Sequence, residues 1–107
     1  MAAIVSYQRG ETVPIWRNVK NASGTLVTPD QGCDVTLKDP DGTLAVAIDT
    51  TDIDDVAMSA VSTGLYVYYF RTLTTDKKGE WNWSAKATHG SGDAAKYDIR
   101  TGAFDLT

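Results

Sequence analysis

The sequence predicts an all-β protein, an antiparallel sandwich or barrel, and two patterns support this prediction. Apolar residues recur at every second position, as in residues 33–38, where Cys33, Val35 and Leu37 alternate with polar residues. Turn-forming residues separate these stretches at short intervals. No stretch shows the 3.6-residue period of an amphipathic helix, so strands joined by turns account for the whole chain.

The first half of the chain is predicted to form five strands. Val13, Ile15 and Val19 place one apolar face on the second of them, and Arg17 interrupts that face. We expect Arg17 to pair with an aspartate or to lie at the rim of the sandwich. The turn at 39–42 has Pro at its second position and Gly at its fourth, which suits a type I turn. The five predicted strands are residues 3–8, 12–20, 25–28, 33–38 and 43–48.

The second half is predicted to form four more strands. Residues 50–55 are polar or acidic except for Ile53 and are expected to form an exposed loop before them, with or without one helical turn. The last strand contains Gly102, where we expect a β-bulge that resets the face on which Phe104 and Leu106 lie. The four predicted strands are residues 56–61, 65–71, 80–88 and 94–106.

An aromatic row in residues 65–71 is predicted to form the centre of the core. One face of this strand carries rings, and the other face is also largely apolar, so the strand is central and is either covered on both sides or presents one side to a partner. We expect Tyr66 to face Trp81. The alternative is a platform of exposed rings that stacks on sugar or single-stranded nucleic acid. The predicted core residues are Tyr66, Tyr68, Phe70, Trp81, Trp83, Val35 and Leu37.

The composition is that of one soluble globular domain spanning residues 1–107. Hydrophobic residues make up 42% of the chain and charged residues 22%. No apolar run approaches the roughly 18 residues that a membrane-spanning helix needs, so no membrane partner is expected. The N-terminus has no basic segment before an apolar one, and if Met1 is the native start we expect synthesis and folding in the cytoplasm.

Charge and reactive side chains argue against nucleic-acid binding and against catalysis. The net charge of -4 opposes binding to polyanions. Cys33 is the only cysteine and is expected to be a small core hydrophobe. His89 is the only histidine, it lies in a glycine-rich turn, and no nucleophile motif accompanies it. We therefore expect no enzyme activity and no cofactor.

One acidic cluster is a weak candidate for a divalent cation site. Its carboxylates could supply several of the six to eight oxygens that Ca²⁺ takes, but it lacks the loop glycine and the distal glutamate of a calcium hand. A solvated acidic loop is the preferred interpretation. The cluster consists of Asp49, Asp52, Asp54 and Asp55.

Read from end to end, the chain resembles the single-domain immunoglobulin-like modules found in virion proteins of tailed phages and in some bacterial and archaeal surface proteins. The resemblance covers nearly the whole chain, although Glu11 and Asn21 stand where Asp is commoner in such modules. It implies an immunoglobulin-like β-sandwich of seven to nine antiparallel strands. The residues that carry it are Gly10–Val13, Asn21–Gly24, Thr28–Pro29, Val35–Gly42, Gly64–Phe70, Gly79–Trp81 and Phe104–Leu106.

The resemblance implies a structural or adhesive role without catalytic residues. We expect a virion structural protein of a tailed phage, assembled in the host cytoplasm, that docks onto the capsid, the neck or the tail through sheet edges and loops. Its partners would be other virion proteins and copies of itself. The alternative is a carbohydrate-binding or adhesion module with Trp16 and Tyr69 as stacking residues; a hydrolase is the least favoured reading. The expected interface residues are Trp16, Ile4, Tyr69, Lys77 and Lys78.

Overall fold

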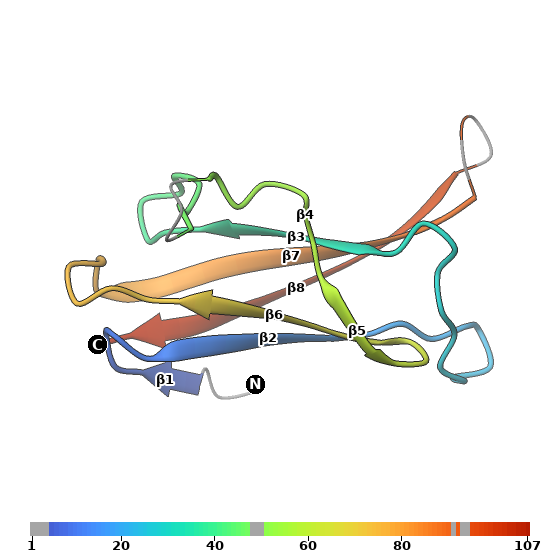
Figure 1. Cartoon of the computed structure of the whole chain (residues 1–107), viewed down its shortest axis with the longest axis horizontal. Helices are drawn as coiled ribbons and strands as arrows, with labels where there is room; N and C mark the ends of the chain where they lie inside the picture. Colours follow the sequence, from blue (N-terminus) through green and yellow to red (C-terminus); the bar gives the residue numbers. More distant parts are fainter. Residues whose placement is uncertain (1–4, 48–50, 91, 93–94) are drawn as a thin grey trace.

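A computed structural model describes residues 5–47, 51–90, 92 and 95–107 and contains eight strands in two sheets (Figure 1). The five-stranded sheet has the order β1-β8-β7-β3-β4, and the three-stranded sheet has the order β2-β6-β5. No helix in the described ranges is long and apolar enough to cross a membrane. The strands are β1 (Val5–Tyr7), β2 (Thr12–Asn18), β3 (Cys33–Lys38), β4 (Val56–Ala57), β5 (Ser59–Ser62), β6 (Leu65–Arg71), β7 (Gly79–His89) and β8 (Lys96–Leu106).

The strand order is that of an immunoglobulin-like sandwich. In immunoglobulin domains, strands B, E and D are neighbours in one sheet and strands C, F and G in the other. Here β2, β6 and β5 take the first three places, and β3, β7 and β8 take the second three. The predicted fold class is therefore confirmed, with one exception to antiparallel pairing: β1 runs parallel to β8, with Val5 opposite Phe104.

Two of the nine predicted strands are absent from the regular sheets. Residues 25–28 contribute only the bridge between Lys20 and Leu26, and residues 43–47 contribute only isolated bridges. In the second case the backbone of Ala45 bonds to Leu37 on one side and to Ile53 on the other. Residue 48 lies outside the described residues. Ala45 is buried and Val46 is exposed, so the alternation of Leu44 and Val46 did not indicate the buried face of this segment.

The predicted strand at 56–61 divides at Met58 into two strands that belong to different sheets. β4 pairs with β3, whereas β5 pairs with β6. Figure 1 shows this yellow-green segment crossing from one layer to the other. Met58 is buried at the crossing, and its N–H donates to the carbonyl of Cys33. The loop before it is not wholly exposed as expected, because Ile53 is fully buried and anchors the loop in the core.

Aromatic residues fill one end of the interior. Trp81 stacks on Phe104 with ring centroids 6.1 Å apart and contacts Phe70 at 5.6 Å. The expectation that Trp81 faces Tyr66 is wrong, because Tyr66 lies opposite Arg17 of β2, four residues along the strand from Phe70. Val35, Leu37, Tyr66, Phe70 and Trp81 are buried, and Tyr68 and Trp83 are half-buried against them.

The predicted bulge at Gly102 is also wrong. β7 and β8 pair without a register shift from Gly79 opposite Leu106 to His89 opposite Lys96. Gly102 instead leaves room for the indole directly opposite, since a Cβ there would lie 2.2 Å from Cζ2 of Trp83. Phe104 and Leu106 thus stay on the inward face that they share with Gly102.

Arg17 pairs with an aspartate, which is one of the two outcomes expected for it. Its Nη2 lies 2.9 Å from Oδ2 of Asp98 and also donates to the Asp98 carbonyl at 3.0 Å. The Arg17 side chain is buried, and its Nε has no hydrogen-bond acceptor among the described residues. This ion pair links β2 to β8 across the open side of the sandwich, because β2 is the edge of one sheet and β8 lies beside the edge of the other.

Candidate interaction surface

The outer face of the three-stranded sheet, on β2 and β6, carries two exposed aromatic rings. Trp16 is directly opposite Val67, and Pro14 is directly opposite Tyr69, so Trp16 and Tyr69 are diagonal neighbours on one face. Trp16 is 47% exposed and Tyr69 is 60% exposed. Val67 between them is only 3% exposed, although it lies outside the core cluster. The large side chains of this face therefore shield its centre from water.

The outer face has a polar row at one end and a mixed row at the other. The pairs Thr12 with Arg71 and Asn18 with Leu65 form its first and last rows. Between them, the apolar centre on β2 and β6 consists of Pro14, Trp16, Val67 and Tyr69, and the exposed Ser59 of β5 lies beside Val67. An apolar centre with a polar rim is the usual anatomy of a protein interface, and exposed Trp and Tyr are the residues that dominate binding energy most often.

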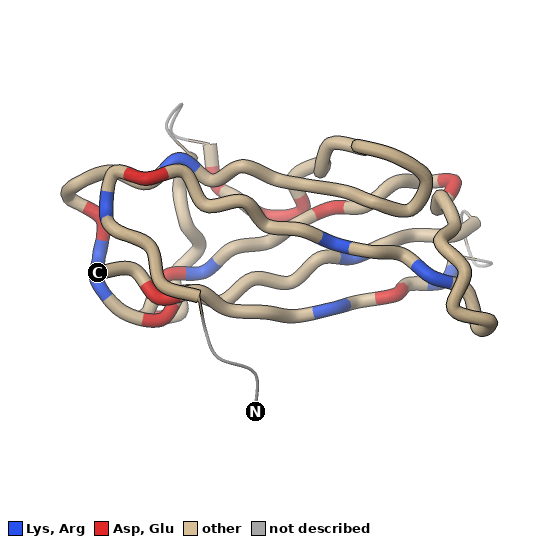
Figure 2. The backbone as a smooth tube through the Cα atoms, turned by 90° about the horizontal axis from the view of Figure 1, so that it is seen from below, with Lys and Arg blue, Asp and Glu red and all other residues tan. Residues whose placement is uncertain are grey.

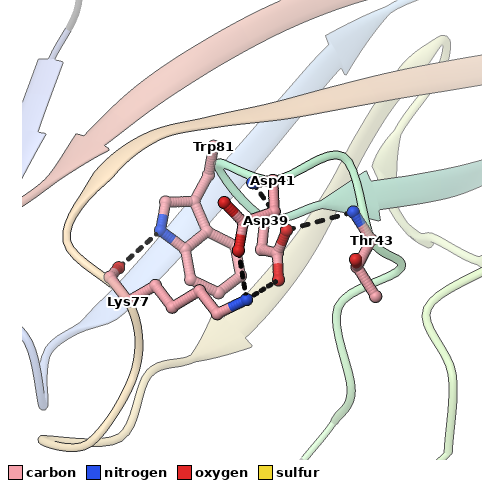
Figure 3. Close-up of polar contacts among 5 residues, drawn as sticks. All are labelled: Asp39, Asp41, Thr43, Lys77 and Trp81. Carbon is pink, nitrogen blue, oxygen red and sulfur yellow. Dashed lines mark hydrogen bonds and ion pairs between the residues drawn. The ribbon is translucent and has the colours of Figure 1, made fainter.

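Lys77 and Lys78 lie elsewhere, in the loop between β6 and β7. Lys77 does not present a free ammonium group: its Nζ lies 3.2 Å from Oδ2 of Asp39 and 2.5 Å from Oδ2 of Asp41 (Figure 3). The Lys77 carbonyl accepts a hydrogen bond from Nε1 of Trp81 at 2.9 Å. Lys77 therefore ties this loop to the turn after β3 and to the core tryptophan. Lys78 is exposed.

The carboxylate of Asp39 organises that turn. Its Oδ1 accepts hydrogen bonds from the N–H groups of Asp41 and Thr43 (Figure 3). Burial by itself would raise the pKa of Asp39, but these hydrogen bonds and the one from Lys77 outweigh it and lower the pKa below its usual value. The hydrogen bond to Asp41 is the main cause that raises the pKa of Lys77. These contacts hold the turn after β3 against the β6–β7 loop.

The five expected interface residues do not form one surface. Trp16 and Tyr69 lie together on the outer face, whereas Lys77 and Lys78 lie in the β6–β7 loop, where Lys77 contacts the turn after the other sheet's strand β3. Ile4 lies outside the described residues. The alternation along 65–71 identified Tyr69 and its apolar neighbours. Alternation along β2 likewise places Pro14 on the face of Trp16, but that Trp16 and Tyr69 lie side by side becomes visible only once β2 is paired with β6.

The acidic cluster is dispersed where the structure describes it. Oδ1 of Asp54 accepts a hydrogen bond from Thr36 at 3.4 Å, and Oδ1 of Asp55 lies 3.6 Å from Nζ of Lys86. Asp52 is exposed, and Asp49 lies outside the described residues. Within 5–47, 51–90, 92 and 95–107, no three His, Cys, Asp or Glu side chains gather closely enough to hold a metal ion.

Comparison with known proteins gives a likeness in fold. No protein-family model and no curated protein matches this chain. Among solved structures, the chain is similar to part of a DUF4785 family protein from Legionella pneumophila, with a TM-score of 0.61 and 15% sequence identity. The match covers 96% of this chain and 26% of that protein. At this identity the likeness shows that the two share a β-sandwich domain.

Proposed function

We propose that this chain is a non-catalytic structural subunit of a tailed-phage virion, which docks onto partners in the capsid, neck or tail. The phage assignment rests on the turn and strand pattern of the sequence. The docking role rests on the outer face, where Trp16 and Tyr69 flank buried Val67 on a sheet that no described element covers. Rings and arrays are common among such subunits, so copies of this chain are expected partners as well.

The proposal is tested by comparing two tyrosines of nearly equal exposure on different sheets. Tyr69 is 60% exposed on the outer face, and Tyr97 is 62% exposed on β8 of the other sheet. The wild-type protein, Tyr69→Ser and Tyr97→Ser are each sized by light scattering, alone and after mixing with virus particles that lack this protein. We expect Tyr69→Ser to weaken association at least tenfold, because a tyrosine anchor of an interface contributes roughly 2 kcal/mol or more. Tyr97→Ser should associate like the wild type.

Three results would count against this role. Equal association of both variants would remove the outer face from the interface, and equal loss in both would point to a non-specific effect. A wild-type protein that neither self-associates nor binds the particles would refute the docking role itself. Thermal unfolding of each variant shows whether a loss of association reflects a loss of fold.

A second function, carbohydrate binding, is favoured by the same two rings, because exposed aromatic residues on one sheet face can stack on sugars. The face offers few hydrogen-bonding groups for a sugar: between its end rows lie Pro14, Trp16, Val67 and Tyr69, and β5 adds the exposed Ser59 beside Val67. A glycan array separates the two roles. Binding to a glycan that Tyr69→Ser abolishes would place the carbohydrate role first.

A further inference from the structure

A groove runs along the open side of the sandwich between β2 and β8. Its first part is a pocket of about 260 Å³ that includes Val5 of β1, Trp16 of β2 and Trp83 of β7 in its lining. Its second part is another pocket of about 280 Å³, lined by Arg17, Asn18, Lys20 and Arg100. The two parts follow one another: on the β2 side the lining passes from residues 13–16 to Arg17, Asn18 and, beyond the end of the strand, Lys20, while along β8 it passes from Phe104 to Arg100.

The first part is apolar and the second is basic. Of the three cations in the second part, Arg17 and Arg100 share one carboxylate, Asp98, at 2.9 Å and 3.6 Å. Lys20 is exposed and forms no ion pair within the described residues. Positive charge is thus in excess here, in a chain whose net charge is -4. Figure 2, which views this side, shows Lys and Arg positions along neighbouring strands toward the end away from the C-terminus.

The backbone of β2 offers hydrogen bonds at the same edge. The N–H of Val19 donates to the Gly64 carbonyl, and the carbonyl of Glu11 accepts from Thr72. Odd-numbered residues therefore direct their backbone groups toward β6, and even-numbered residues direct theirs toward the edge of β2 with which no described strand pairs. Pro14 agrees with this alternation, because proline is tolerated where its missing N–H faces away from the partner strand. Both backbone groups of Trp16 and Asn18 face the edge.

We propose that this groove binds an extended acidic segment of a partner protein by strand addition to β2. The segment places an apolar side chain between Trp16 and Trp83 and one or two carboxylates beside Lys20 and Arg100. The distance from Trp16 to Lys20 along a strand, at about 3.3 Å per residue, requires a separation of about four residues between these groups. Main-chain hydrogen bonds supply affinity and the pockets supply selectivity, as in other cases of strand addition. This inference rests on the proposed docking role and names a second contact for it.

The probes are synthetic eight-residue peptides of alternating threonine and valine with two glutamates at one end. A second peptide carries the glutamates at the opposite end, because the strand could add in either direction, and matched peptides carry glutamine instead. Affinity is measured by calorimetry at low and at moderate salt. We expect one of the two glutamate peptides to bind at least tenfold more tightly than its glutamine counterpart, with the difference shrinking as salt rises.

The double variant Lys20→Glu/Arg100→Glu should weaken binding of that peptide at least tenfold, whereas Lys78→Glu, an exposed lysine outside the groove, should change it less than twofold. Amide hydrogen exchange tests strand addition itself. The peptide should slow exchange at Trp16, whose N–H faces the edge, and leave Ile15 unchanged, because its N–H already faces β6. If the double variant fails to fold, the glutamate-against-glutamine comparison and the exchange at Trp16 in the wild type still decide.

The proposal is wrong if neither glutamate peptide binds, if glutamine peptides bind equally well, or if exchange at Trp16 does not change. It is also wrong if the double variant and Lys78→Glu behave alike. If the wild-type protein self-associates and the double variant does not, the groove binds a second copy of this chain. That result would refute an acidic segment of another protein as its occupant. The proposed docking role is tested separately on Tyr69, which lies outside the groove, so the two failures are distinguishable.

Discussion

Gly102 gives the indole of Trp83 the space that it occupies. The backbone of Gly102 lies outside the left-handed region, so alanine would fit its conformation, and alanine is normally preferred to glycine within a strand. Here a Cβ would lie 2.2 Å from Cζ2 of Trp83. We expect Gly102→Ala to lower the free energy of unfolding by about 1 to 3 kcal/mol, as overpacking does. Urea unfolding measures this change.

A double-mutant comparison isolates the steric cause. In a Trp83→Leu background the added methyl group meets no indole, so Gly102→Ala should become neutral or slightly stabilising there. An equal loss of stability in both backgrounds would show that the backbone of Gly102, rather than the ring opposite it, requires glycine. At the scale of single residues, the sequence marked this position correctly as special and assigned it the wrong reason, because a glycine in a strand pattern is compatible with either a bulge or a close approach.

The turn at Asp39 links two elements that are far apart in the sequence, and its contribution to stability depends on pH. Because the pKa of Asp39 is lowered in the folded protein, its charged form contributes stability above the ordinary carboxyl pKa of about 4, and this contribution is lost as the pH falls through the lower folded value. We expect Asp39→Asn to lower the free energy of unfolding at pH 7 by on the order of 2 kcal/mol. Below pH 4 the difference from the wild type should shrink.

Urea unfolding at a series of pH values between 7 and 3 measures this, with Glu80→Gln as a control that removes an exposed carboxylate close to the turn that bonds to none of its described residues. A constant difference between Asp39→Asn and the wild type across the series would contradict an electrostatic role for Asp39. The sequence predicted the turn itself from Pro40 and Gly42. It could not predict the contact with Lys77, which is 38 residues away, because only the packing of the two loops brings them together.

The elements that the sequence predicted well are those with long ladders. Residues 33–38 and 43–48 show the same alternation, yet only the first is a strand, because β7 pairs with all six of its residues. Residues 43–47 have no such neighbour and bond at single positions. The sequence could not predict that the chain changes sheets at Met58. Alternation indicates which face of a strand a residue occupies, but it carries no information about which sheet that strand joins.

At the scale of the whole molecule, stability and docking depend on different residues, and two consecutive residues of β2 show this. Ile15 is 2% exposed and faces the core, whereas Trp16 is 47% exposed and faces outward. We expect Ile15→Ala to lower the free energy of unfolding by about 2 to 5 kcal/mol. Trp16→Ala should lower it by about 1 kcal/mol, since it uncovers part of Val67, but it should weaken association more than any loss of fold explains.

Thermal unfolding and light scattering on the same samples measure the two effects. Because Trp16 belongs both to the outer face and to the apolar part of the groove, its replacement should impair docking through either surface. Replacement of Tyr69 tests the outer face alone, and replacement of Lys20 tests the groove alone. If Trp16→Ala collapses the melt while association of the remaining folded protein survives, Trp16 supports the sheet rather than a partner. The outer face would then lose its main anchor, and docking would have to depend on the basic part of the groove or on the loops.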